Sequence, residues 1–261
     1  MHSVRVASRA RRRGLAGGQR RRREGCRTVT LDIDHGEVTA VIGQKHSGKS
    51  VLMERLFCEM DRFVLLDPNH EHGPPDSAAV ERYQDVWTHW MDGQTQQVVR
   101  DRRGALINDR MEEWVRAAAQ LQDCYLGIDE AHKFMNANSC PDVLRTLVKH
   151  VVSHQNVGFI FGVHMAKDIP SDVWSQIDNF VIFSYGDKWD AKMQDTSIPY
   201  KKVVKDGYGA SAAGMADETT IPEPELRDGL DPKSYRFLTY KDGLDGTSTV
   251  EGPVPIPAHL H

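Results

Sequence analysis

The segment GQKHSGKS at residues 43–50 restricts the fold more than any other part of the sequence. The apolar run 38–42 before it predicts a strand, and the apolar spacing after Ser50 predicts a helix. A glycine-bounded loop between such elements lets successive backbone N–H groups face a phosphate at the helix N-terminus. The pattern G-x-x-x-x-G-K-[ST] is highly specific in this setting, so the sequence predicts a P-loop nucleotide-binding domain.

Each position of this loop has an expected role. Lys49 would reach the β- and γ-phosphate oxygens, and Ser50 would ligate Mg²⁺, so ATP and Mg²⁺ are the expected ligand and cofactor. His46 is expected to offer only its backbone. The residues expected to bind the nucleotide are Gly43, Gln44, Lys45, His46, Ser47, Gly48, Lys49, Ser50 and Val51.

A second set of polar residues follows two other predicted strands. The buried strand 124–128 runs into Asp129, expected to hold the Mg²⁺ shell, and Glu130, expected to deprotonate the attacking water. An adjacent glutamate favours repeated hydrolysis over a switch. Gly127 interrupts this strand for no reason visible in the sequence. His164, at the end of strand 157–163, is either a catalytic γ-phosphate sensor or a structural, hydrogen-bonded histidine.

Strands and helices alternate from residue 38 to residue 184. This order predicts an α/β fold of the RecA-like (ASCE) P-loop class, a mainly parallel sheet with helices on both faces and ligands at the carboxyl ends of the strands. In the segment 69–105, residues 87–90 and 97–100 are expected as short strands around an Asp92-Gly93 turn. The predicted ATPase core covers residues 28–186, and residues 187–261 form an irregular extension with a strand or hairpin near 235–250.

The first 27 residues differ from the rest of the chain in charge. They hold ten arginines and one acid, Glu24, whereas the whole chain of 261 residues has a net charge of −4. This arm is either a disordered tail, including residues added by an upstream start codon, or a flexible clamp on nucleic-acid phosphates. A transit peptide is a weaker alternative, because the arm has little apolar content.

The remaining composition favours a soluble, intracellular protein. The four cysteines are dispersed without a C-x-x-C pair, which favours a reducing compartment and argues against a cysteine zinc site. The longest notable apolar run, residues 157–163, is far shorter than the roughly twenty residues of a membrane helix. We therefore expect no stable membrane insertion and a cytoplasmic location.

Residues 129–132 spell DEAH, the box of one helicase superfamily. That architecture needs a second motor domain, but only about 75 irregular residues follow Gly186, and a Ser-Ala-Thr motif is missing from the next strand. We therefore interpret the box as a coincidence and His132 as a loop contact. His150 and His154, spaced i, i+4, are interpreted as a solvated or interface face, because no third metal ligand accompanies them.

The ordered set of motifs resembles the HerA/FtsK superfamily of DNA-pumping ATPases over about residues 36–184. The matching pieces are the loop 43–50, the strand and loop LLDPNHE at 65–71, the acidic strand running into DEAHKF at 129–134, and the segment 156–183. Two departures are evident. The family usually has Gln where this chain has His164, and it often carries Arg where this chain has Ser153-His154.

The resemblance implies a ring, usually a hexamer, that threads double-stranded DNA. The arginine that completes each ATP site would come from a neighbouring subunit, and Arg145, Arg100, Arg102 and Arg103 are candidates. The short core resembles the genome-packaging ATPases of tailless, membrane-containing viruses. This resemblance implies a capsid or portal protein as a further partner, and a location in the host cytoplasm or at a packaging vertex of the virion. The alternatives are a mobile-element or conjugative DNA-transfer ATPase, a nucleotide-dependent switch or assembly factor without a DNA track, and a helicase fragment.

Overall fold

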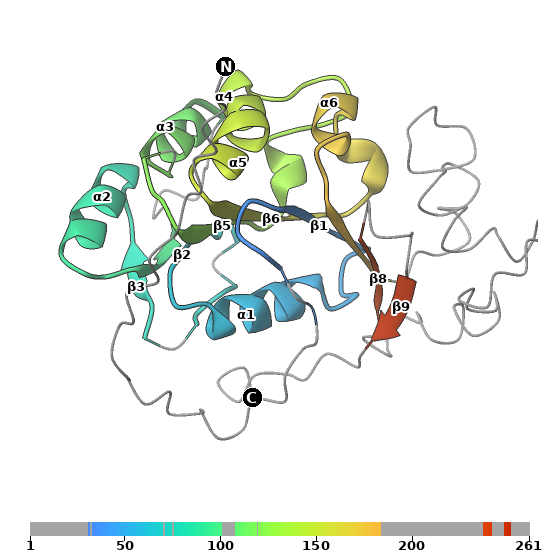
Figure 1. Cartoon of the computed structure of the whole chain (residues 1–261), viewed down its shortest axis with the longest axis horizontal. Helices are drawn as coiled ribbons and strands as arrows, with labels where there is room; N and C mark the ends of the chain where they lie inside the picture. The colour runs from blue at the N-terminus through green and yellow to red at the C-terminus, as the bar shows by residue number, and fades with distance from the viewer. Residues whose placement is uncertain are drawn as a thin grey trace, which may run out of the picture.

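The computed structural model describes residues 31, 33–69, 71–74, 76–100, 108–118, 120–183, 237–241 and 248–251 (Figure 1). The basic arm, Arg102 and Arg103 lie outside these residues. Most of the predicted irregular extension, residues 187–236, also lies outside them.

One sheet forms the centre of the molecule, with the strand order β3-β4-β2-β5-β6-β1-β7-β8-β9. The first seven strands in this order are parallel, which confirms the mainly parallel sheet predicted from the sequence. The last two are antiparallel additions beside β7. The strands are β1 (Val38–Ile42), β2 (Phe63–Leu66), β3 (Ala78–Val80), β4 (Gln96–Val99), β5 (Cys124–Ile128), β6 (Val157–Val163), β7 (Asn179–Phe183), β8 (Phe237–Lys241) and β9 (Ser248–Glu251).

Helices cover both faces of the sheet, as predicted (Figure 1). Helix α1 lies against one face, and α3 to α6 lie against the other. A π-helical turn, Leu147–Val151, joins α4 to α5, and two 3₁₀ turns cover Ala131–Lys133 and Ala166–Asp168. The helices are α1 (Lys49–Glu59), α2 (Tyr83–Met91), α3 (Asn108–Ala118), α4 (Asp142–Thr146), α5 (Val152–His154) and α6 (Ser171–Trp174).

The core divides into two clusters because the strands, buried on both faces, alternate their side chains between them. The smaller cluster joins α1 to strands β1, β2, β4, β6 and β7. Gly127 belongs to this contact: a Cβ there would lie 2.3 Å from Cζ of Phe57 and 2.7 Å from Cδ1 of Leu65. Glycine at this position in β5 therefore lets the Phe57 ring approach the sheet.

The segment 83–91 corrects the sequence analysis. Residues 87–90, expected as a strand, lie in helix α2, whereas β4 at Gln96–Val99 matches the other strand expected there. Tyr83, Val86 and Trp90 pack on the core at helical spacing, and Trp87 is left exposed. The inward-facing residues thus follow the helical period of about 3.6 and not the period of two that a strand requires.

The strands β8 and β9 pair with each other and extend the sheet beyond β7. They fall in the segment where the sequence analysis placed a strand or hairpin, residues 235–250. None of the helices in the described ranges is long and apolar enough to span a lipid bilayer.

Candidate active site

The predicted site residues follow three adjacent strands, in the order β5, β6 and β1, and β2 lies on the other side of β5. Asp67 follows β2, Asp129 and Glu130 follow β5, His164 follows β6, and the glycine-rich loop follows β1. The strands are parallel, so their carboxyl ends meet at one edge of the sheet. The fold thus brings together residues that lie far apart in the sequence.

The loop between β1 and α1 has the backbone of a phosphate site. Gly48 is left-handed (φ 102°) and precedes α1, whose first turn has no side-chain cap and no acidic residue. The backbone N–H groups at this helix end and its positive dipole are therefore available to an anion. Gly43 is required by packing, because a Cβ there would lie 2.6 Å from Cβ of Phe183 and from Oγ of Ser47.

Lys49 supplies a buried cation beside this loop. Its side chain is 4% exposed, and Nζ donates to the backbone oxygen of Gln44 at 3.3 Å. Burial lowers the pKa of Lys49, against the opposing effect of Asp129, Glu130 and other nearby carboxylates. A buried ammonium in this position is suited to bind an anion such as a phosphate.

Ser50 and Asp129 form the pair expected to hold Mg²⁺. Ser50 Oγ donates to Asp129 Oδ2 at 2.9 Å, and Glu130 N donates to Oδ1 at 2.8 Å. Gly162 on β6 leaves room for this carboxylate, since a Cβ there would lie 2.7 Å from Oδ1. A hydroxyl and a carboxylate are oxygen ligands of the kind Mg²⁺ prefers, so the residues fit the ion.

His72 is a site residue that the sequence analysis missed. Its Nε2 lies 2.8 Å from Asp129 Oδ2, and its Nδ1 lies 3.2 Å from Glu54 Oε2. All three side chains are 1% exposed. Burial alone would lower the pKa of His72, but the hydrogen bonds to Asp129 and Glu54 raise it to about 10. His72 is therefore a buried imidazolium that orients the Asp129 carboxylate.

The same contact sets the charge of Asp129. Burial would raise its pKa, but the hydrogen bond and charge of His72, with the Ser50 hydroxyl, lower it to about 2. Asp129 is thus ionised at neutral pH, as a metal ligand must be. The only sequence signal for His72 is its place directly after the LLDPNHE segment.

Glu130 adopts a left-handed backbone (φ 54°, ψ 39°), an uncommon conformation for a residue other than glycine and one that clusters at functional sites. Its Oε1 lies 3.0 Å from His164 Nε2, and its Oε2 lies 3.3 Å from His132 Nε2. Burial and the charge of Lys49 lower the pKa of His164, against the opposing effect of Glu130. A neutral imidazole offers one donor and one acceptor, as the amide of glutamine does.

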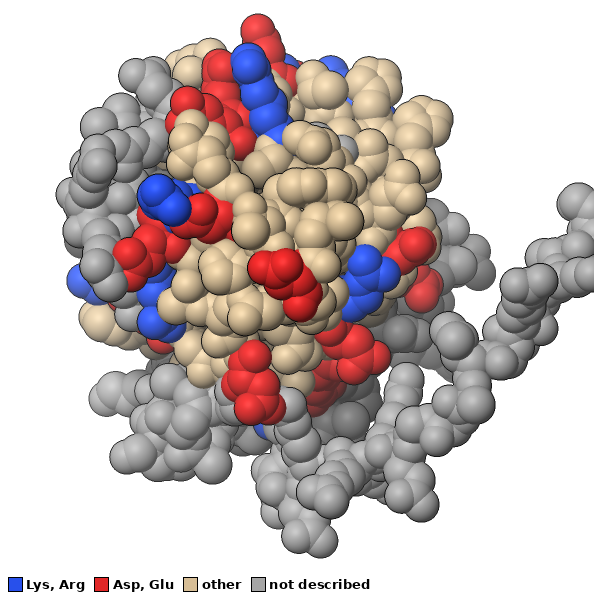
Figure 2. Space-filling view, turned by 90° about the vertical axis from the view of Figure 1, so that its left-hand side faces the viewer, with Lys and Arg blue, Asp and Glu red and all other residues tan. Residues whose placement is uncertain are grey.

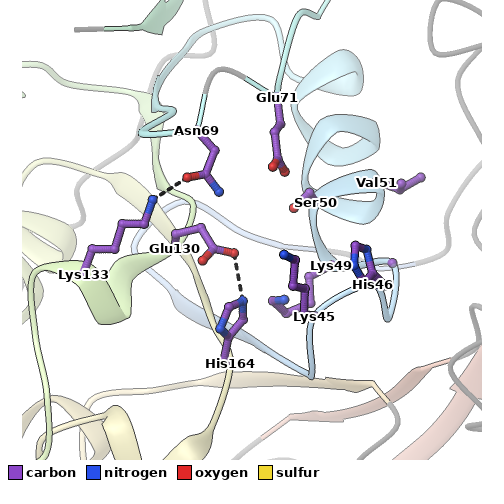
Figure 3. Close-up of a pocket in the computed structure, with 11 residues that line it drawn as sticks. Lys45, His46, Lys49, Ser50, Val51, Asn69, Glu71, Glu130, Lys133 and His164 are labelled. Atoms are coloured by element: carbon purple, nitrogen blue, oxygen red, sulfur yellow. Dashed lines mark hydrogen bonds and ion pairs between the residues drawn. The ribbon is translucent and has the colours of Figure 1, made fainter. Parts of the chain in front are cut away.

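Lys49, Ser50, Glu130 and His164 line one cavity of about 640 Å³ (Figure 3). Glu130 and His164 lie across it from Lys49 and Lys45, and Asn69 and Glu71 reach it from the loop after β2. Lys133 hydrogen-bonds Asn69 at its rim. Asn69 and Glu71 had no role in the sequence analysis, although both belong to a segment that carries the family resemblance. The lining residues are Lys45, His46, Gly48, Lys49, Ser50, Val51, Asn69, Glu71, Glu130, Lys133 and His164.

Three of the expected nucleotide-binding residues support the loop without lining this cavity. Gly43 is packed against Phe183, and Gln44 offers its backbone oxygen to Lys49. Ser47 is buried, and its Oγ makes no hydrogen bond to any described residue. His46, which lines the cavity, is exposed and left-handed (φ 65°).

Two of the four arginine candidates are paired within their own chain. Arg100 Nε lies 3.5 Å from the buried carboxylate of Asp67, and Arg145 Nε lies 2.9 Å from Asp172 Oδ2. Arg145 Nη1 also contacts Asp142 at 3.2 Å.

No protein-family model matches this sequence. A comparison with curated proteins also gave no match. Solved structures do match. The genome packaging NTPase B204 of Sulfolobus turreted icosahedral virus 2, in complex with ATP-gammaS, has a TM-score of 0.59 at 19% identity, covering 84% of this chain and 98% of B204. The structure of B204 in complex with sulfate has a TM-score of 0.57 at 18% identity, covering 87% of this chain and 100% of B204.

A third structure, B204, the DNA-packaging ATPase of Sulfolobus turreted icosahedral virus, has a TM-score of 0.56 at 18% identity and covers 84% of this chain and 98% of its own. At these identities the likeness shows the fold. The chain has a RecA-like α/β fold, and the expectation from the HerA/FtsK resemblance is confirmed at that level.

Proposed function

We propose that this protein is an ATPase that moves double-stranded DNA, and that it packages a viral genome as a ring-shaped oligomer. The observation that carries the proposal is one cavity at the carboxyl edge of the sheet, lined by Lys49, Ser50, Glu130 and His164. Asp129 lies behind this lining and is hydrogen-bonded to Ser50. This grouping provides the parts that phosphoryl transfer to water needs: a phosphate cradle, a metal-binding pair and a base.

The roles of the residues follow from their positions. Lys49 and the loop amides would bind the phosphates, and Ser50 with Asp129 would hold Mg²⁺, which neutralises charge on the phosphate oxygens when bound. Glu130 would accept a proton from the attacking water, and His164, neutral and 3.0 Å from Oε1, would keep its carboxylate oriented.

The coupling to DNA is supported by the kind of protein that shares this fold. The matching structures are of a genome packaging NTPase and a DNA-packaging ATPase from viruses. Their chains are covered almost completely, so the likeness is not limited to the nucleotide loop. Because a shared fold supports a function only by analogy, the coupling needs a biochemical test.

A ring is proposed because the described residues supply no free arginine at the cavity. No arginine is among the described residues that line the cavity. To act on a neighbouring subunit, Arg100 or Arg145 would have to leave the carboxylate partner that it has in its own chain. A neighbouring subunit would supply the arginine that stabilises transition-state charge, as in other ATPases that complete their sites between subunits. We propose a hexamer from the family resemblance, with a capsid or portal protein as a further partner and a location in the host cytoplasm or at a packaging vertex.

The DNA-binding surface is proposed to include the basic arm, residues 1–27. On the face shown in Figure 2, the described residues carry acidic and basic side chains interspersed, and the basic ones form no continuous area there. A surface that tracks the DNA backbone needs clustered positive charge. The ten arginines of the arm would provide it.

The ATPase proposal is tested with two variants and a control. Glu130→Gln should retain ATP binding and reduce hydrolysis at least about 100-fold, within the range expected for loss of a general base. Lys49→Ala should weaken ATP binding itself. Glu113→Gln, which makes the same change on an exposed helix residue, should leave both unchanged. Equal turnover in Glu130→Gln and wild type would show that Glu130 is not the base.

The DNA proposal is tested by measuring hydrolysis with and without duplex DNA. We expect duplex DNA to increase turnover and a salt-dependent complex to form. An ATPase rate that duplex DNA leaves unchanged would instead favour the nucleotide-dependent switch or assembly factor. Particle mass measured with ATP and DNA present would test the ring.

A further inference from the structure

We propose that Glu130, His132 and His164 form a binding site for a transition-metal ion, with Zn²⁺ as the expected ion, and that this ion inhibits hydrolysis. Each of the three residues offers one ligand atom, and these atoms lie within 4.8 Å of one another. Among the described residues this cluster combines two imidazoles and one carboxylate. His132, interpreted from the sequence as a loop contact, thus gains a specific role.

The ligand atoms lie close to the spacing that a tetrahedral ion requires, with a different Glu130 oxygen facing each histidine. Bonds of about 2.0–2.2 Å place two ligands of a tetrahedral zinc ion roughly 3.3–3.6 Å apart. The observed separations are 3.0 Å from Glu130 Oε1 to His164 Nε2 and 3.3 Å from Glu130 Oε2 to His132 Nε2. The two imidazole rings lie side by side, with centroids 4.2 Å apart and planes inclined by 31°. Small side-chain adjustments would bring all three ligands onto one ion.

The backbone holds these side chains in place before any ion binds. Glu130 is fixed in its left-handed conformation at the start of the 3₁₀ turn Ala131–Lys133, which carries His132. His164 directly follows β6. The side chains of His132 and His164 are 23% and 29% exposed, so solvent ions can reach them.

The ligand set selects the class of ion. Two histidines and one glutamate are a known zinc ligand set, in which the fourth position stays open, and imidazole also suits copper, iron and nickel. Mg²⁺ prefers oxygen ligands in octahedral geometry and is therefore expected at Ser50 and Asp129 instead. The two ions would occupy neighbouring but chemically different sites.

Binding of Zn²⁺ would remove the Glu130 carboxylate from its role as a base. ATP binding depends on the loop around Lys49 and should persist. Hydrolysis should fall because the carboxylate and His164 would both be ligands. This inhibitory consequence rests on the proposed ATPase function, whereas metal binding itself does not.

The binding test uses the purified full chain without nucleotide. Zn²⁺ is titrated in competition with a chromogenic zinc chelator, for wild type, His132→Ala and the control His150→Ala. His150 is a suitable control because its ring stacks on His154, with centroids 6.4 Å apart, in a pair without a third ligand among the described residues. We expect His132→Ala to weaken Zn²⁺ binding by more than roughly tenfold, at least as much as loss of an outer-shell partner does, and His150→Ala to change nothing.

A second variant, His164→Gln, removes a different ligand, so the test does not depend on correct folding of His132→Ala alone. In a separate measurement, the visible absorption of bound Co²⁺ should report a tetrahedral site in wild type only. Equal Zn²⁺ affinity in wild type, His132→Ala and His164→Gln would overturn the proposed site. In a hydrolysis assay with buffered free Zn²⁺, wild type should be inhibited at lower Zn²⁺ than His132→Ala. Zn²⁺ binding at the site without loss of hydrolysis would refute the inhibitory role. Absence of hydrolysis in zinc-free wild type would count against the ATPase proposal alone.

Discussion

Replacing His72 with glutamine should destabilise the protein strongly. The substitution keeps a hydrogen-bonding side chain but removes the positive charge between Glu54 and Asp129, which are both 1% exposed. Both carboxylates would then lose the buried positive charge that lies between them. Breaking a buried ion pair in this way costs about 3–5 kcal/mol.

The pKa of His72 gives a second estimate of the stability lost in this variant. The shift from 6.5 to about 10 corresponds to roughly 5 kcal/mol of preferential stabilisation of the charged ring in the folded state. In the variant, Glu54 would still accept a hydrogen bond from the backbone N–H of Gly73. Asp129 would still accept hydrogen bonds from the Ser50 hydroxyl and the backbone N–H of Glu130, so part of the lost stabilisation is compensated. We therefore expect a loss of about 3 kcal/mol in the free energy of unfolding at pH 7.

The pH dependence provides an internal check. Because the folded pKa of His72 is raised, its contribution is complete below about pH 6.5 and is lost as the pH rises toward 10. In this interval the titration of His72 should lower the free energy of unfolding of the wild type by about 1.4 kcal/mol per pH unit. His72→Gln should not show this decrease. The stability difference between the two proteins should therefore shrink from pH 7 to pH 9.

The assay is guanidinium denaturation of the full chain in EDTA without nucleotide, followed by circular dichroism at pH 7, 8 and 9. His150→Gln, the same change at an exposed position, is the control and should stay within about 0.5 kcal/mol of wild type. A His72→Gln variant as stable as wild type at pH 7, or a difference that does not change with pH, would refute a buried imidazolium at this site.

Three further outcomes are expected. Gly127→Ala should lower the free energy of unfolding by about 1–3 kcal/mol, because its Cβ would overlap the Phe57 ring. Adding Phe57→Leu to this variant should recover part of the lost stability, and purely additive effects in the double-mutant cycle would contradict the contact. Burial raises the pKa of the Cys124 thiol to about 12. Iodoacetamide at pH 8 should therefore alkylate half-buried Cys58 well before Cys124, as measured by peptide mass spectrometry. Equal alkylation rates would argue against the described core. Deleting residues 1–27 should lower DNA affinity and flatten its salt dependence if the arm is a phosphate clamp, and an unchanged slope would identify it as a passive tail.

The sequence predicted those parts of the site that a local pattern specifies. The loop 43–50 carries its own geometry, and Asp129, Glu130 and His164 each end a strongly apolar strand. Parallel pairing then brings these strand ends together, so knowing the strands was enough to predict which residues meet.

The parts that were missed depend on contacts between distant segments. His72 lies in an irregular loop, and its partners Glu54 and Asp129 are 18 and 57 residues away along the chain, so no local pattern marks it. Gly127 can be explained only once Phe57 is seen against β5. Residues 87–90 of helix α2 were predicted as a strand, because the core that Tyr83, Val86 and Trp90 face is formed by distant segments.

The antiparallel pair β8–β9 has a practical consequence for work on oligomers. These strands cover the side of β7 that faces away from β1, and they come from residues far beyond the last motif. In a protein truncated after residue 186, β7 would become an edge strand with unpaired backbone N–H and C=O groups, to which a second copy could add its own strand. Assemblies formed by such a shortened protein could arise from strand addition instead of ring closure, so subunit stoichiometry should be measured on the intact chain.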